Sequence, residues 1–163
     1  MKKILFLLSI ILYSCTFNNL MVGNGAKIES EKFYNGTGLL YDSHNYLVKK
    51  LQKESKLKMW DSLKYNQELK KLPPGGVLTV HIIRPTIGGA STDNFTVVIM
   101  QDGVEKERIV GEKNLPDASN LTENWISYFA IALNKKYITP FDVYIIDDLR
   151  EERYHYKVSP TDL

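Results

Sequence analysis

Apolar and polar residues alternate with a period of two over most of the chain beyond residue 76, and this pattern constrains the fold more than any other feature. Residues that alternate in this way place their side chains on opposite faces of a β-strand. The short connections between the alternating segments favour an antiparallel sheet. We therefore predict an α+β or mostly β fold, with a six-stranded antiparallel sheet or small sandwich preceded by a helical segment. The predicted strands are 77–84, 95–101, 104–110, 125–133, 141–147 and 150–158.

Local features place some of these strands within the sheet. The 77–84 segment is apolar on both faces, as is typical of a central strand. Asp102-Gly103 predicts a two-residue hairpin turn that leads into 104–110, whose charged side chains suit a solvated edge. The 125–133 segment also fits a helix, because its aromatic residues recur at spacings of three and four, but we favour a strand.

A helical segment is predicted over residues 42–72. Asp42 or Ser43 caps its start, apolar residues follow at helical spacing, and the Pro-Pro-Gly-Gly sequence at 73–76 ends it. The apolar stripe slips near residues 54–56. The segment is therefore either one long helix with a rotated stripe or two helices that meet there.

The helical segment is also rich in lysine. It carries eight lysines against four acidic residues, which gives it a local charge of +4. Such a helix either lies against anionic lipid headgroups or forms the solvated face of a helix packed on a core. We favour the packed helix, because Trp60, Leu63 and Leu69 are suited to the core.

The amino terminus has the pattern of a secretion signal. Lys2 and Lys3 precede an apolar run over residues 4–13. A helix needs about 20 apolar residues to cross a bilayer, so this shorter run predicts a cleaved signal peptide rather than a permanent span. Residues 1–14 are therefore excluded from the predicted fold.

The apolar run ends in Leu12-Tyr13-Ser14-Cys15, which resembles the lipobox of a bacterial lipoprotein. In that family a branched apolar residue, a small residue and an invariant cysteine occupy the positions of Leu12, Ser14 and Cys15. The resemblance implies cleavage between Ser14 and Cys15 and lipidation of Cys15, which anchors the chain in a membrane. The residue after the cysteine, Thr16, is not the inner-membrane retention Asp, so the resemblance implies the outer membrane if the cell has two.

The mature chain is predicted to consist of a tether and one globular domain. Residues 15–38 contain the lipidated cysteine and a glycine-rich, aperiodic stretch of the kind that forms a flexible tether of about 25 Å. Residues 39–163 form the single domain. Cys15 is the only cysteine, so the domain has no internal disulfide.

Few side chains suggest a catalytic or metal-binding site. The three histidines, His44, His81 and His155, lack metal-ligand spacing, and we predict neither a metal nor a cofactor. We expect the acidic 142–152 hairpin to be a solvated turn with local ion pairs, although its carboxylates also suit a hard cation or a glycosidase acid and base. Its acidic residues are Asp142, Asp147, Asp148, Glu151 and Glu152.

A non-enzymatic function follows from the anchor, the tether and the lack of catalytic motifs. The preferred hypothesis is a lipid-anchored protein of the bacterial envelope that binds an envelope protein or a ligand. The formal charge of +2 gives no reason to expect nucleic acid as a partner. Two alternatives stay open: an envelope hydrolase that uses the 142–152 hairpin, and a structural role in envelope assembly.

Overall fold

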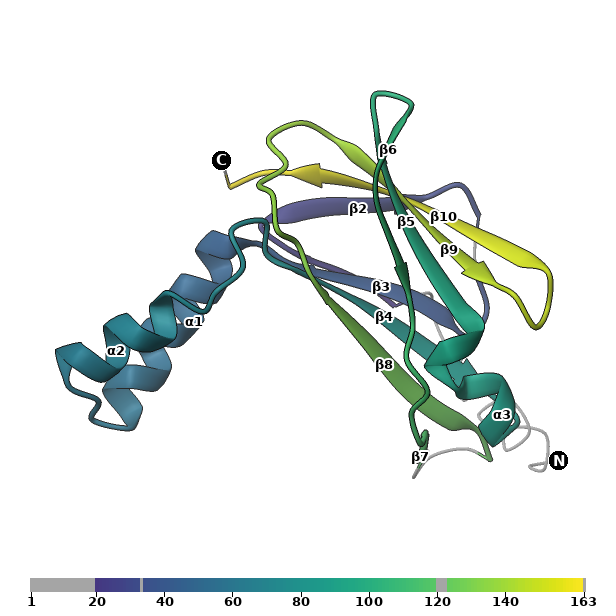
Figure 1. Cartoon of the computed structure of the whole chain (residues 1–163), viewed down its shortest axis with the longest axis horizontal. Helices are drawn as coiled ribbons and strands as arrows, with labels where there is room; N and C mark the ends of the chain where they lie inside the picture. The colour runs from purple at the N-terminus through teal and green to yellow at the C-terminus, as the bar shows by residue number, and fades with distance from the viewer. Residues whose placement is uncertain (1–19, 33, 120–122, 163) are drawn as a thin grey trace, which may run out of the picture.

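The computed structural model describes residues 20–32, 34–119 and 123–162. The predicted signal peptide, its cleavage site at Ser14 and the lipidation site at Cys15 lie outside the described residues. The described chain is mostly β, as predicted, and forms two five-stranded sheets that face each other (Figure 1). The prediction of six strands is wrong, because four short or glycine-containing strands were not recognised in the sequence: β1, β2, β3 and β7.

Each sheet is built from strands that are distant in sequence. The first sheet contains, in spatial order, β1 (Met21–Asn24), β3 (Thr37–Asp42), β4 (Val77–Arg84), β8 (Trp125–Ala132) and β7 (Asp117–Ala118). The second contains β2 (Ala26–Ser30), β10 (Glu152–Pro160), β9 (Phe141–Asp147), β5 (Phe95–Gln101) and β6 (Val104–Val110). Neighbouring described strands run antiparallel, apart from the parallel pair β1 and β3.

The core lies between the two sheets. Alternate residues of the central strands point inward and are buried, such as Leu78, Val80 and Ile82 of β4. They meet the inward residues of β5, β9 and β10, among them Val97, Val143 and Tyr156. Every residue of this core cluster lies between Ala26 and Val158. A chain cleaved after Ser14 therefore keeps every core residue that the structure describes.

The tether predicted over 15–38 is wrong from residue 21 onward. β1 belongs to the first sheet and β2 to the second, so the domain begins well before the predicted boundary at residue 39. Gly25 makes the change of sheet possible, because its φ of +85° is disfavoured for residues with a side chain. A Cβ there would also lie 2.3 Å from the Ser43 hydroxyl. The segment looked aperiodic because its strands are short and hydrogen-bond to distant partners.

Several strand predictions are confirmed. β4 is the middle strand of the first sheet, and β6 is an edge of the second. Asp102 and Gly103 have φ values of 53° and 73°, as a tight hairpin between β5 and β6 requires. The 125–133 segment is strand β8 rather than a helix.

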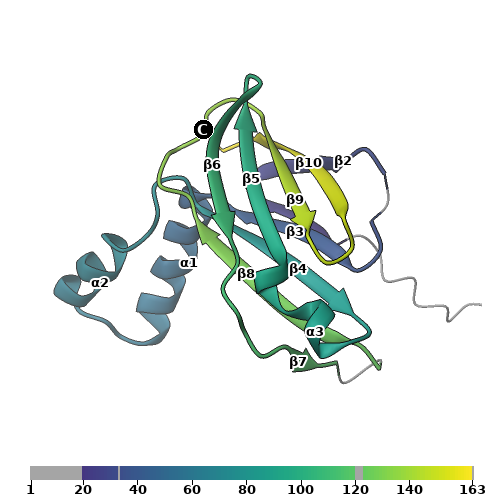
Figure 2. The same ribbon diagram turned by 45° about the vertical axis from the view of Figure 1, so that its right-hand side comes forward.

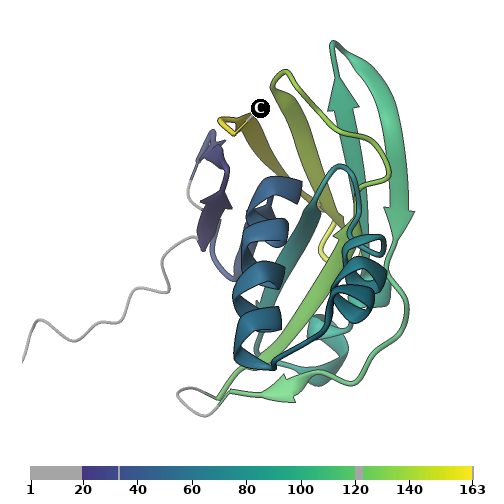
Figure 3. The same cartoon turned by 90° about the vertical axis from the view of Figure 1, so that its left-hand side faces the viewer.

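Two helices form within the predicted helical segment, but they follow β3 instead of preceding the sheet. α1 (His44–Leu57) is capped by Ser43, and α2 (Ser62–Leu69) is capped by Asp61. They project together from one end of the sandwich, as Figure 1 shows, and Figure 3 views the molecule from that end. Leu51 is the buried residue of α1, and α2 has none. The expectation that Trp60, Leu63 and Leu69 belong to the core is therefore wrong.

The opposite end of the sandwich is crossed by a short helical connection. The chain leaves β4 of the first sheet and enters β5 of the second through α3 (Ile87–Ala90) and the 3₁₀ helix η1 (Thr92–Asn94). Figure 2 shows α3 at this end. The loop contains Gly88 and Gly89, and the Thr86 hydroxyl caps it by accepting from the backbone NH of Gly89.

The helices are an insertion that the sandwich does not need. Asp42 and Val77, which flank the inserted segment, are paired across β3 and β4. Replacing residues 46–71 with a short Gly-Ser linker should preserve the β-sheet circular dichroism spectrum. The replacement should lower the unfolding free energy, measured by urea denaturation, by no more than about 3 kcal/mol, because Leu51 is the buried side chain that it removes.

Leu78→Ala is the control for this measurement. Leu78 is buried in the core of β4, and its truncation should cost about 2–5 kcal/mol. A linker variant that loses its sheet spectrum would contradict the interpretation of the helices as an insertion.

Candidate functional site

A buried ion pair joins the two sheets at the end of the core near α3. Arg84 is the last residue of β4, and Asp147 is the last residue of β9. Their side chains point inward in register with the apolar residues of their strands, and each is only 1% exposed. Arg84 Nη2 lies 2.8 Å from the Asp147 carboxylate.

Hydrogen bonds hold the Arg84 guanidinium from several directions. Nη2 also donates to the hydroxyls of Thr37 and Tyr154, at 2.9 and 3.1 Å, and Nη1 donates to the carbonyl oxygens of Gly36 and Ile83. The guanidinium lies 5.3 Å from the centre of the Phe95 ring. Burial raises the pKa of the Tyr154 hydroxyl to about 12, so this phenol stays neutral. These contacts compensate for removing both charges from water.

This pair changes the interpretation of the acidic 142–152 hairpin. Asp147 is not on a solvated turn, because Arg84 and the backbone NH of Arg150 hold its carboxylate. Asp142 lies 2.9 Å from His155 Nε2, and Glu152 accepts a hydrogen bond from the Tyr154 hydroxyl. No group of three or more metal-ligating side chains gathers among the described residues. Asp148 and Glu151 are exposed at the turn, so only Asp142, Asp147 and Glu152 of the five carboxylates are held by these contacts.

The histidines are placed separately. His81 lies on β4 and His155 on β10. These strands belong to different sheets, so the two histidines do not face each other across neighbouring strands. The His155 ring stacks on Tyr144, with 4.5 Å between ring centres, and its two nitrogens contact Glu31 and Asp142. His155 is thus engaged on the outer face of the second sheet.

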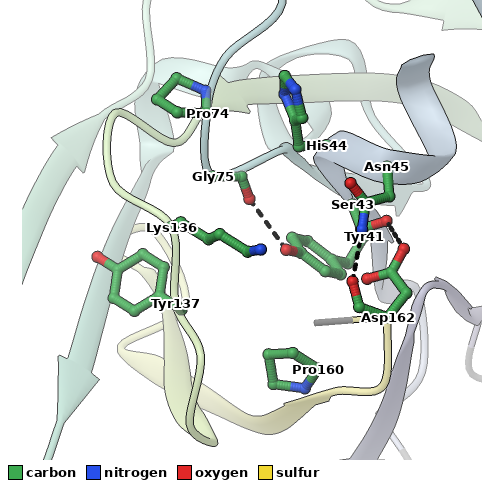
Figure 4. Close-up of a pocket in the computed structure, with 10 residues that line it drawn as sticks. All are labelled: Tyr41, Ser43, His44, Asn45, Pro74, Gly75, Lys136, Tyr137, Pro160 and Asp162. Atoms are coloured by element: carbon green, nitrogen blue, oxygen red, sulfur yellow. Dashed lines mark hydrogen bonds between the residues drawn. The ribbon is translucent and has the colours of Figure 1, made fainter.

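A small pocket at the start of α1 brings together serine, histidine and aspartate, the residue types of a hydrolytic triad (Figure 4). Ser43 Oγ donates to the Asp162 carboxylate and accepts from the backbone NH of Tyr46, as a helix cap does. The His44 ring points away from Ser43, and its Nδ1 lies 3.0 Å from the carbonyl oxygen of Pro73. With no base beside the hydroxyl, the trio lacks the geometry of a triad.

The residues that line this pocket have a structural role. Its volume of about 10 Å³ holds no more than one water molecule. Asn45 Nδ2 donates to the carbonyl oxygen of Asp162, and the Tyr41 hydroxyl donates to that of Gly75. The bonds of Ser43 and Asn45 to Asp162 fasten the carboxyl-terminal segment to the start of α1, and the Tyr41 bond joins β3 to the segment that precedes β4.

A larger groove lies on the outer face of the first sheet. His81 of β4 and Tyr128 of β8 are cross-strand partners, and their rings stack with 4.9 Å between centres and 15° between planes. Ile83, Ile126 and Leu20 add apolar surface to the same groove, whose volume is about 250 Å³. Tyr128 is 57% exposed, so an aromatic face is available to a ligand.

The groove has an uncharged wall. Desolvation lowers the pKa of His81, which keeps its ring neutral at neutral pH. The Nε2 atom of His81 is buried and makes no hydrogen bond with the described residues. A neutral, mostly apolar groove with an exposed aromatic ring suits an apolar or aromatic group rather than an ion.

The sequence singled out Asp147 of the ion pair and His81 of the groove, but not their partners Arg84 and Tyr128. Arg84 follows Leu78, Val80 and Ile82 at a spacing of two, so alternation alone places it on their inward face. Tyr128 is one of several aromatic residues in its segment, and only the pairing of β4 with β8 brings it to His81. Cys15 and Ser14, the residues predicted from the lipobox, lie outside the described residues.

Comparison with known proteins finds no match to any family model, curated protein or solved structure. No helix in the described part of the chain is long and apolar enough to cross a membrane.

Proposed function

We propose that the chain is a bacterial envelope lipoprotein that is anchored through Cys15 and binds an apolar or aromatic group in the groove beside His81 and Tyr128. It acts as a binding module and carries out no chemistry on what it binds. The observation that carries the binding function is the exposed Tyr128 ring above a neutral, apolar groove. Its partners are the membrane, through the lipid, and an envelope protein or small ligand, and nucleic acid is not among them.

The position of the core supports the anchor. Cleavage between Ser14 and Cys15 removes no residue of the core cluster, which begins at Ala26. The lipid would then be joined to a chain that keeps every described residue of the core. Thr16 directs the protein to the outer membrane in a cell with two membranes, by the family rule for the residue after the cysteine.

The domain lies much closer to the anchor than it would if residues 15–38 formed a flexible tether. Leu20, which hydrogen-bonds to Leu39 and lines the groove, is five positions after Cys15. Five residues span at most about 17 Å. A lipid on Cys15 therefore keeps the groove close to the bilayer surface, where it meets molecules that are themselves bound to or near the membrane.

The geometry disfavours the hydrolase alternative. An acid and base pair requires two carboxylates that are both accessible to a substrate. Asp147 is buried against Arg84, and Asp142 is engaged by His155. Asp148 and Glu151 are exposed, but they line neither the small pocket nor the groove in which a substrate could lie. No described contact favours the alternative role in envelope assembly over binding in the groove.

The anchor is tested by the intact mass of protein taken from the membrane fraction. We expect wild type to begin at Cys15 and to carry acyl chains, and Cys15→Ala to be neither acylated nor cleaved at this site, because the acylated sulfur is missing. A wild-type mass that corresponds to an unprocessed amino terminus, or to a mature chain without lipid, would contradict the anchor.

The groove is tested with N-phenyl-1-naphthylamine, an uncharged fluorescent probe that binds apolar surfaces. Tyr128→Ala should weaken probe binding roughly tenfold, because the exposed ring is the main aromatic surface of the groove. Tyr144→Ala is the matched control, since it also removes a tyrosine stacked on a histidine, but on the second sheet. Equal effects of the two substitutions, or no effect of Tyr128→Ala, would refute the groove as the binding site.

A further inference from the structure

The tip of the α1–α2 hairpin exposes apolar side chains to an unusual degree. Leu57, Met59 and Leu63 are 83%, 91% and 68% exposed. They lie at the end of α1, in the turn between the two helices and at the start of α2. This is the end of the hairpin that projects furthest from the sandwich (Figure 1). A soluble protein gains nothing for its own stability from large apolar side chains in this position.

Trp60 lies in the same turn, between two lysines. The ammonium groups of Lys58 and Lys64 lie 5.5 and 5.7 Å from the centre of its ring. Tryptophan and lysine side by side, next to exposed aliphatic residues, are typical of segments that enter the interface between lipid headgroups and acyl chains.

A lysine-rich face leads along α1 to this tip. Lys49, Lys50, Lys53 and Lys56 recur at spacings of three and four, so they share one side of the helix with Tyr46 and line a shallow groove. None of these four lysines forms an ion pair with a described residue, whereas Lys58 and Lys64 are paired with Glu54 and Glu68. The unpaired lysines present positive charge beside an apolar tip.

We propose that the α1–α2 hairpin is a second membrane contact, whose apolar tip enters the interface of an anionic bilayer while the lysine face of α1 binds the headgroups. The proposal deepens the proposed function by adding a lipid class that the protein recognises, and it relies on the Cys15 anchor only for proximity. A convex tip suits a fluid bilayer, which needs no preformed complementary cleft. The unpaired lysines select anionic lipid.

The position of the hairpin gives this contact a consequence for orientation. β1 runs parallel to β3, so Leu20 lies toward the start of β3, whereas α1 begins where β3 ends at Asp42. α1 then extends a further 21 Å or so from that end of the sheet. The lipid anchor and the hairpin tip thus contact the bilayer at two separated points, which lays the molecule along the surface instead of letting it stand on its anchor.

The fluorescence of Trp60 tests the proposal in the full protein purified from the membrane fraction. The chain has two tryptophans, so Trp125→Phe leaves Trp60 as the single reporter. In vesicles of phosphatidylglycerol and phosphatidylcholine that contain brominated acyl chains, Trp60 emission should shift to the blue and be quenched. Both effects should be lost in vesicles of phosphatidylcholine alone and in the triple variant Lys49→Gln/Lys50→Gln/Lys53→Gln.

Substitutions at the tip provide a matched comparison. Leu57→Ser/Met59→Ser in the single-tryptophan protein should abolish the quenching, because it removes the inserted side chains. Val104→Ser, which changes an exposed apolar residue at the β5–β6 turn, should leave the quenching unchanged. Circular dichroism of each variant checks that the hairpin remains helical.

Vesicle flotation and intact mass separate this proposal from the anchor. Protein that floats with anionic vesicles but shows an unquenched Trp60 would overturn the membrane role of the tip, which would then be free to dock a protein. Protein that floats with a quenched Trp60 but carries no lipid on Cys15 would support the hairpin contact and refute the anchor. Protein that does not float at all would overturn both.

Discussion

The buried pair of Arg84 and Asp147 is the interaction on which the rest of the structure depends. It joins the last residue of β4 to the last residue of β9 and so fixes how the two sheets meet. A shift of β4 by one residue would turn Arg84 outward and leave Asp147 as an unpaired buried charge, so the pair penalises every other register. Thr37 and Tyr154 complete the network from β3 and β10, and the same four strands carry much of the core.

The sequence predicted those parts of the fold that depend on residues close together in the chain. Alternation identified β4, β5, β6, β8, β9 and β10, and the Asp102-Gly103 turn followed from the backbone freedom of its residues. β1 and β2 escaped detection, because they are short and their hydrogen bonds come from β3 and β10. The hydrogen bonds of Arg84 reach residues up to 70 positions away in sequence, which no local pattern reveals. The apolar stripe of the 42–72 segment identified its helices, but periodicity does not say whether a stripe faces a core, and here Leu63 faces outward.

These features assign different tasks to different parts of the molecule. The sandwich supplies a rigid body held by its core and its ion pair, and the outer face of its first sheet carries the groove of His81 and Tyr128. The helical hairpin contributes almost nothing to the core, which leaves its lysines and its apolar tip available for a contact outside the domain. In the proposed arrangement, the lipid on Cys15 and the hairpin tip hold the sandwich against the bilayer. They therefore determine how the groove is oriented relative to the membrane surface.

A double-mutant cycle on Arg84 and Asp147 is the most direct test of this account. Unfolding free energies in urea would be compared for wild type, Arg84→Met, Asp147→Leu and the double variant. We expect each single substitution to cost about 3–5 kcal/mol, because each leaves an unpaired buried charge, and the double variant to be nearly as stable as wild type. Small and additive effects of the two substitutions would show that the sheets are held together without the ion pair, and would contradict its central place in the fold.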